Sequence, residues 1–109
     1  MNGNEARKVV EVNSDYKYVA DIAKSLLVLA KMDLGKTHAS MGFGLGLIEG
    51  AGTKQNPFRP KDGDNFRAGR MKMDVEGRVI SSGISTDFPK YSFNDAELQA
   101  FFEVADIRF

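Results

Sequence analysis

The chain has 109 residues, and its fifteen Lys and Arg balance fifteen Asp and Glu, so the formal net charge at pH 7 is zero. Hydrophobic residues make up 42% and charged residues 28%, close to the composition of an ordinary globular domain. These values exclude a disordered chain and a uniformly basic nucleic-acid binder. The length indicates one domain, too short for a dinucleotide-binding dehydrogenase or a barrel. Because cysteine is absent, disulfides, thiolate metal sites and a cysteine nucleophile are excluded.

The cellular location follows from what the sequence lacks. Its most apolar segment, residues 25–30, is far shorter than the roughly 20 residues that cross a bilayer. The first residues contain no apolar run behind a basic stretch, so no signal peptide is expected. We therefore expect a cytoplasmic protein with no membrane partner, and no motif in the chain calls for a cofactor.

Hydrophobic spacing predicts three elements in the first half of the chain. Residues 1–6 are expected to fray, and residues 6–13 are expected to form a short strand. Apolar residues three and four apart predict a helix over 15–34, with Gly35 as its left-handed C-terminal residue. Alternation of large apolar residues with small or polar ones predicts a strand over 37–49.

Turn and capping residues organise the second half. Residues 50–65 contain glycine, proline and asparagine and predict a long loop. Residues 66–86 predict a hairpin, in which a turn from Asp74 to Gly77 pairs Met73 with Val79; a shorter loop would pair Met73 with Ile80 instead. A helix over 95–105 is predicted by Asn94 and Glu97, which have the spacing of a capping box.

These elements indicate a small single-domain α+β fold in the order β-α-β-β-β-α. The simplest arrangement is a two-layer sandwich, in which an antiparallel sheet of three or four strands carries both helices on one face. The other face of the sheet would then be open to water or to a partner.

The first candidate binding surface is one face of the strand predicted over 37–49. It carries Gly42, Gly44 and Gly46, flanked by His38 and Ser40. Three glycines leave about 13 Å of strand without side chains, which indicates that something approaches the backbone closely. Either a helix packs there, or the face is presented to a ligand or a flat partner. A dinucleotide site is not favoured, because the glycine spacing differs from that fingerprint.

The second candidate is a basic segment with interleaved aromatic residues. Residues 52–73 carry six basic and two acidic side chains, a net charge of +4, while residues 74–109 carry −4. A basic, aromatic segment is suited to phosphates and stacked bases. Arg70 and Lys72 would share a sheet face with Ser82, on which His38 and Ser40 could also lie. The candidate residues of this segment are Lys54, Arg59, Lys61, Arg67, Arg70 and Lys72.

Three functional hypotheses follow. The leading one is a non-enzymatic binding protein whose open, glycine-rich face contacts a protein partner or a second copy of the chain, since the +4 and −4 segments could pair across a symmetric dimer. The alternative is binding of nucleic acid or another polyanion by the basic segment. The third is a small enzyme that uses His38, the only histidine, as a general base; one histidine cannot form a multi-histidine metal site.

Overall fold

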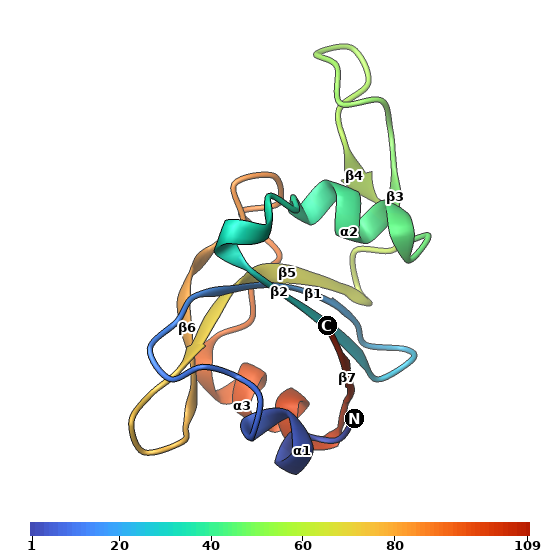
Figure 1. The fold of residues 1–109 in the computed structure, drawn as a ribbon. Helices are drawn as coiled ribbons and strands as arrows, with labels where there is room; N and C mark the ends of the chain where they lie inside the picture. The colour runs from blue at the N-terminus through green and yellow to red at the C-terminus, as the bar shows by residue number, and fades with distance from the viewer.

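The fold is organised around a five-stranded sheet with strand order β6-β5-β1-β2-β7, seen in a computed structural model that describes residues 1–109. All neighbouring strands are antiparallel except β7, which runs parallel to β2. A second sheet of two short strands, β3 and β4, forms the base of a projecting arm (Figure 1). The main-sheet strands are β1 (Tyr16–Asp21), β2 (Leu26–Lys31), β5 (Phe66–Met73), β6 (Val79–Ile84) and β7 (Asp106–Arg108).

The helix predicted over 15–34 is wrong, because this segment forms the β1–β2 hairpin and then a short 3-10 helix, η1 (Met32–Leu34). Both faces of these strands are covered, so five of the six β1 residues are buried. A strand buried on both faces loses its two-residue alternation, and its apolar residues then fit a helical stripe equally well. The expected left-handed conformation of Gly35 is present, with φ of 71°, after η1.

The strand predicted over 37–49 is also wrong. His38–Gly44 forms helix α2, which begins at a capping box between Thr37 and Ser40, and only Ile48–Glu49 forms a strand, β3. The buried residues of α2 are His38, Ala39, Met41 and Gly42, which lie on one helical face. β3 pairs with β4 (Arg59–Pro60), and the rest of the predicted loop 50–65 has no regular structure.

The N-terminal segment forms helix α1 (Gly3–Arg7) in place of the expected frayed end and the strand over 6–13. Asn2 and Glu5 form a capping box at its start. Gly3 fits tightly, because a Cβ there would lie 2.7 Å from the carbonyl oxygen of Phe102. Val12, beyond the helix, makes an isolated bridge to Met73.

The second half of the chain confirms its local predictions. Met73 pairs with Val79, and the Asp74 carboxylate accepts hydrogen bonds from the backbone N–H groups of Glu76 and Arg78, each at 2.9 Å. Helix α3 (Asp95–Val104) begins at the predicted capping box of Asn94 and Glu97.

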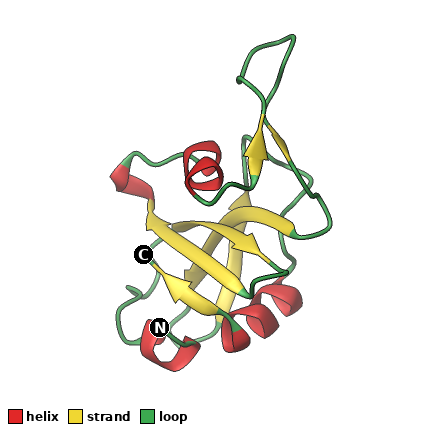
Figure 2. Cartoon of the chain, turned by 90° about the vertical axis from the view of Figure 1, so that its right-hand side faces the viewer, coloured by secondary structure: helices red, strands yellow, loops and turns green.

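The helices cover both faces of the sheet, which corrects the prediction that both lie on one face. α1 and α3 lie on one face, and α2 lies on the other (Figures 1 and 2). The α3 face buries fifteen residues, including Tyr16, Tyr18 and Phe102, whereas the α2 face buries eight, including Val19 and Phe66. The α+β class is confirmed, but the predicted element order is wrong.

Candidate functional site

The predicted glycine-rich sheet face does not exist, because its residues lie in and after helix α2. Gly42 is buried against Ile48, whose Cγ1 would be 2.2 Å from an added Cβ. Gly44 and Gly46 have no atom within 4 Å of such a Cβ. Ser40 is exposed and takes part in the capping box of α2. Gly42 is therefore a packing residue, and the three glycines form no common surface.

The predicted basic segment does not gather on one surface. Arg59 pairs with Glu49 at 3.1 Å, and Arg67 donates hydrogen bonds to carbonyls of the loop that precedes β5, including Gly63 at 2.9 Å. Lys54 and Lys61 are exposed on the arm and in the loop that follows β4. Only Arg70 and Lys72, which alternate along β5, lie on the same sheet face.

His38 is buried, and its Nε2 lies 2.7 Å from the carbonyl oxygen of Gly69. Nε2–H therefore donates to that carbonyl and joins α2 to β5. Burial lowers the pKa of His38, which favours the neutral ring, although the hydrogen bond to Gly69 acts in the opposite direction. No hydroxyl or carboxylate is hydrogen-bonded to the ring, so the structure assembles no catalytic pair around it. No group of three or more His, Cys, Asp or Glu is placed to hold a metal ion.

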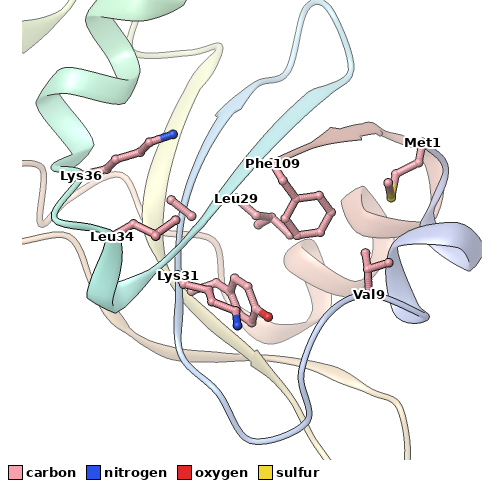
Figure 3. A pocket seen from close by; sticks show the side chains of 9 residues that line it. Met1, Val9, Leu29, Lys31, Leu34, Lys36 and Phe109 are labelled. Atoms are coloured by element: carbon pink, nitrogen blue, oxygen red, sulfur yellow. The ribbon is translucent and has the colours of Figure 1, made fainter.

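An apolar groove along the edge of β2 is the candidate functional site, and sequence reasoning missed it. β7 pairs with β2 only at Leu26–Val28, so the segment Leu29–Lys31 has no neighbouring strand on that side. A cavity of about 360 Å³ follows this free edge, and seven of its nine lining residues are hydrophobic. Figure 3 shows Leu29 and Phe109 near its middle, with Leu34 and Lys36 to one side and Met1 and Val9 to the other.

Four apolar side chains around this edge groove are exposed. Leu34 is 59% exposed, Val9 53%, Phe109 52% and Met1 44%. Single exposed apolar residues are common, whereas several around one cavity indicate a contact surface. The ring of Phe109 packs edge-on against Tyr16, with centroids 6.5 Å apart, and so forms a firm wall.

Two lysines stand at the rim of the edge groove. Lys31 pairs with Glu11, which raises the pKa of Lys31 and lowers that of Glu11. Lys36 is exposed and makes no ion pair, while its backbone carbonyl accepts a hydrogen bond from Lys17 Nζ at 2.7 Å. The groove therefore combines apolar walls with one free positive charge.

The backbone of the free edge is oriented outward. Met32 N–H donates to Asp15 C=O across the β1–β2 hairpin. Because hydrogen-bonded pairs alternate along an antiparallel ladder, Ala30 continues this bonding to β1. Leu29 and Lys31 then point their N–H and C=O groups away from β1. The Leu29 N–H falls within the ladder to β7, whose last register pair is Val28 with Arg108, so the groups left free at the edge groove are the Leu29 C=O and both backbone groups of Lys31.

Comparison with known proteins finds no matching family model, no similar curated protein and no similar solved structure. No helix of the structure is long and apolar enough to cross a membrane. What the protein binds must therefore be inferred from its own residues.

Proposed function

We propose that this protein is a non-enzymatic binding protein that accepts an extended segment of a protein partner along the free edge of β2. The observation that carries the proposal is the coincidence of an unpaired strand edge at Leu29–Lys31 with an apolar cavity on that edge. Strand addition at a sheet edge is a common mode of peptide recognition, in which backbone hydrogen bonds supply affinity and side-chain pockets supply specificity.

The walls of the edge groove define the chemistry of the segment. An extended chain places alternate side chains on opposite sides, so one set would pack against the exposed walls Val9 and Phe109. The unpaired Lys36 favours a carboxylate on the segment near that end of the groove, because opposite charges across an interface improve specificity and association rate. The proposed partner thus presents an extended, apolar stretch with an acidic flank.

The edge groove replaces the glycine-rich face as the contact surface, while the expectation of a protein partner is kept. A second copy of the chain is a weaker occupant, because only three residues of β2 are free at the edge. Two such edges would share a short ladder, whereas a flexible segment can also reach the cavity walls.

Lys31 offers a direct test, because its backbone has φ of −60°, a value that proline adopts without strain. Lys31→Pro removes one outward N–H and leaves the β1–β2 ladder intact. Lys31→Ala is the matched control, since it also loses the pair with Glu11 but keeps the N–H. A display library of short random peptides would be selected on the full chain, and the affinity of a selected peptide would be measured by calorimetry for each variant.

We expect peptides with apolar residues and an acidic end, bound about tenfold or more weakly by Lys31→Pro than by Lys31→Ala. Equal affinity for the two variants would show that the edge N–H is not used and would overturn strand addition. Light scattering tests whether a second copy of the chain occupies the edge groove. A dimer that Lys31→Pro dissociates would assign the groove to that second copy and overturn the peptide proposal.

A further inference from the structure

The half of the α2 face that α2 leaves uncovered carries three positive charges. The β1–β5 register places Lys17 directly opposite Arg70, and Lys72 lies two residues further along β5 on the same side. None of the three takes part in any of the seven ion pairs of the structure. Like charges directly opposite each other on a sheet destabilise the pairing, so this arrangement requires a reason.

Arg70 is held in place although it has no acidic partner. The β5–β6 register shifts between Arg70 and Met71, where Ser82 of β6 has no partner, and the Arg70 guanidinium lies against Gly83. A Cβ at Gly83 would be 2.5 Å from Arg70 Nη2 and 2.8 Å from Cζ, so the guanidinium occupies the space in which a side chain at position 83 would begin. The Nε atom of Arg70 and the hydroxyl of the neighbouring Ser82 are buried and make no hydrogen bond within the chain. Buried polar groups are normally paired, and each exception calls for an explanation.

A cavity of about 240 Å³ lies beside these charges, between the sheet, the start of α2 and the segment after β6. Two cations line it, together with two hydroxyls, one carboxylate and the buried imidazole. Its polar lining consists of Lys17, Thr37, His38, Arg70, Thr86 and Asp87. Asp87 Oδ2 accepts a hydrogen bond from the Ala39 N–H at 3.3 Å, so one of its carboxylate oxygens is already bonded to the start of α2. The cations therefore outnumber the acids at this cavity, and Lys72 adds a third positive charge on the same face.

We propose that this cavity is a binding site for a small phosphorylated molecule, whose phosphate group is held between Arg70 and Lys17. Phosphate is favoured over a carboxylate because the site offers more than one cation for a single ligand. An arginine presents parallel N–H donors that match two phosphate oxygens, and a lysine adds a mobile point charge. The hydroxyls of Thr37 and Thr86 are donors at the same cavity, as phosphate oxygens require.

The cavity also limits the size of the ligand. Its volume holds a phosphate with a small attached group, not a folded polymer. This proposal narrows the sequence-based expectation of a polyanion, since the basic residues of the arm do not join Arg70 here. It is independent of the edge groove, which lies along β2 and has an apolar lining.

The test is titration of the full chain with inorganic phosphate at constant ionic strength, followed by calorimetry and by amide and imidazole NMR shifts. We expect saturable binding, with shifts confined to residues around the cavity, including His38. Arg70→Gln and Lys17→Gln should each weaken binding about tenfold or more, the usual effect of losing a charged hydrogen bond. Lys24→Gln, an exposed lysine in the turn at the other end of β1, changes the charge equally and should leave the affinity unaltered.

Other outcomes would overturn the proposal. If phosphate binding does not saturate, or if Arg70→Gln and Lys24→Gln bind phosphate with equal affinity, the protein attracts phosphate only through its general charge. Single-stranded DNA that binds more tightly than inorganic phosphate, with shifts along the arm, would assign the charges to a nucleic acid. If Arg70→Gln does not fold, Lys17→Gln decides, because Lys17 is only half-buried and its side chain reaches a surface carbonyl.

Discussion

The two faces of the central sheet differ in how completely they are covered. On the α3 face, Tyr16, Tyr18, Leu27, Leu29 and Met71 are almost fully buried beneath α1 and α3. On the α2 face, the apolar half is covered and the other half carries the half-buried cations Lys17, Arg70 and Lys72. The enclosed face supplies most of the hydrophobic stabilisation, which leaves the other face free to carry charges that weaken the fold.

The number and length of the helices explain this difference. On one face α3, about 15 Å long, is joined by α1, whereas the other face has only α2, about 10 Å long. The eight residues of β5 extend about 27 Å. α2 therefore cannot cover the length of β5, and Arg70 and Lys72 lie beyond it. Both proposed sites lie at places that the helices leave uncovered, one at an edge of the sheet and one on a face.

The largest effect should come from opening the α3 core. Phe102 is fully buried on the inner side of α3, and Phe102→Ala should lower the free energy of unfolding by about 3–5 kcal/mol. Phe88 is equally buried on the α2 face but belongs to a loop, which can collapse into the space. We expect Phe88→Ala to cost no more than the low end of that range, about 3 kcal/mol. Urea denaturation measures both, and a larger loss for Phe88→Ala would reverse the ranking of the two faces.

Smaller changes in stability are expected at two glycines of α2, one a loss and the other a gain. Gly42→Ala places a methyl group against the buried Ile48 and should destabilise the protein by about 1–3 kcal/mol. Gly44→Ala meets no neighbouring atom and should stabilise it by up to about 1 kcal/mol, because alanine favours a helix. Thermal unfolding of both variants is the measurement. Destabilisation by both would mean that α2 is not a helix and would restore the predicted strand.

The same helix illustrates what sequence reasoning can and cannot predict. The hairpin turn at Asp74 and the start of α3 at Asn94 were predicted because a few adjacent residues determine them. α2 was missed because its buried face contains the small residues Ala39 and Gly42, which give no strong hydrophobic stripe; Gly42 fits against Ile48. β1 and β2 were missed because both of their faces are buried, a property that depends on helices distant in the sequence.

The candidate sites were predictable only in part, for the same reason. Arg70 and His38 were expected to share a surface and do line one cavity, although His38 reaches it from a helix and not from a strand. The edge groove was not foreseen, because its walls come from both ends of the chain and from the segment after β2. No spacing within one segment indicates such a surface; only the tertiary arrangement brings Met1, Leu34 and Phe109 together.

The smallest predicted effect concerns His38, which belongs to α2, is hydrogen-bonded to Gly69 of β5 and lines the cavity beside Arg70. Burial lowers its pKa below the usual value of about 6.5, and Lys17 and Arg70 act in the same direction while Gly69 and Asp87 oppose it. The unfolded chain therefore binds a proton more readily than the folded one. The contribution of the neutral His38 to the free energy of unfolding is fully present above about pH 6.5. It should decrease as the pH falls from there toward the lower pKa of His38 in the folded state.

Because His38 is the only histidine, its contribution can be isolated between about pH 5 and 6.5, above the range in which carboxylates titrate. We expect the free energy of unfolding to fall with pH in this window, and the slope to disappear in His38→Gln, whose amide can still donate to Gly69. Urea denaturation in phosphate-free buffers measures it, since phosphate would itself stabilise a protein that binds it. An unchanged slope in His38→Gln would mean that the imidazole titrates as freely in the folded protein as in the unfolded chain. The α2 face would then be more open at the histidine than its 4% exposure implies.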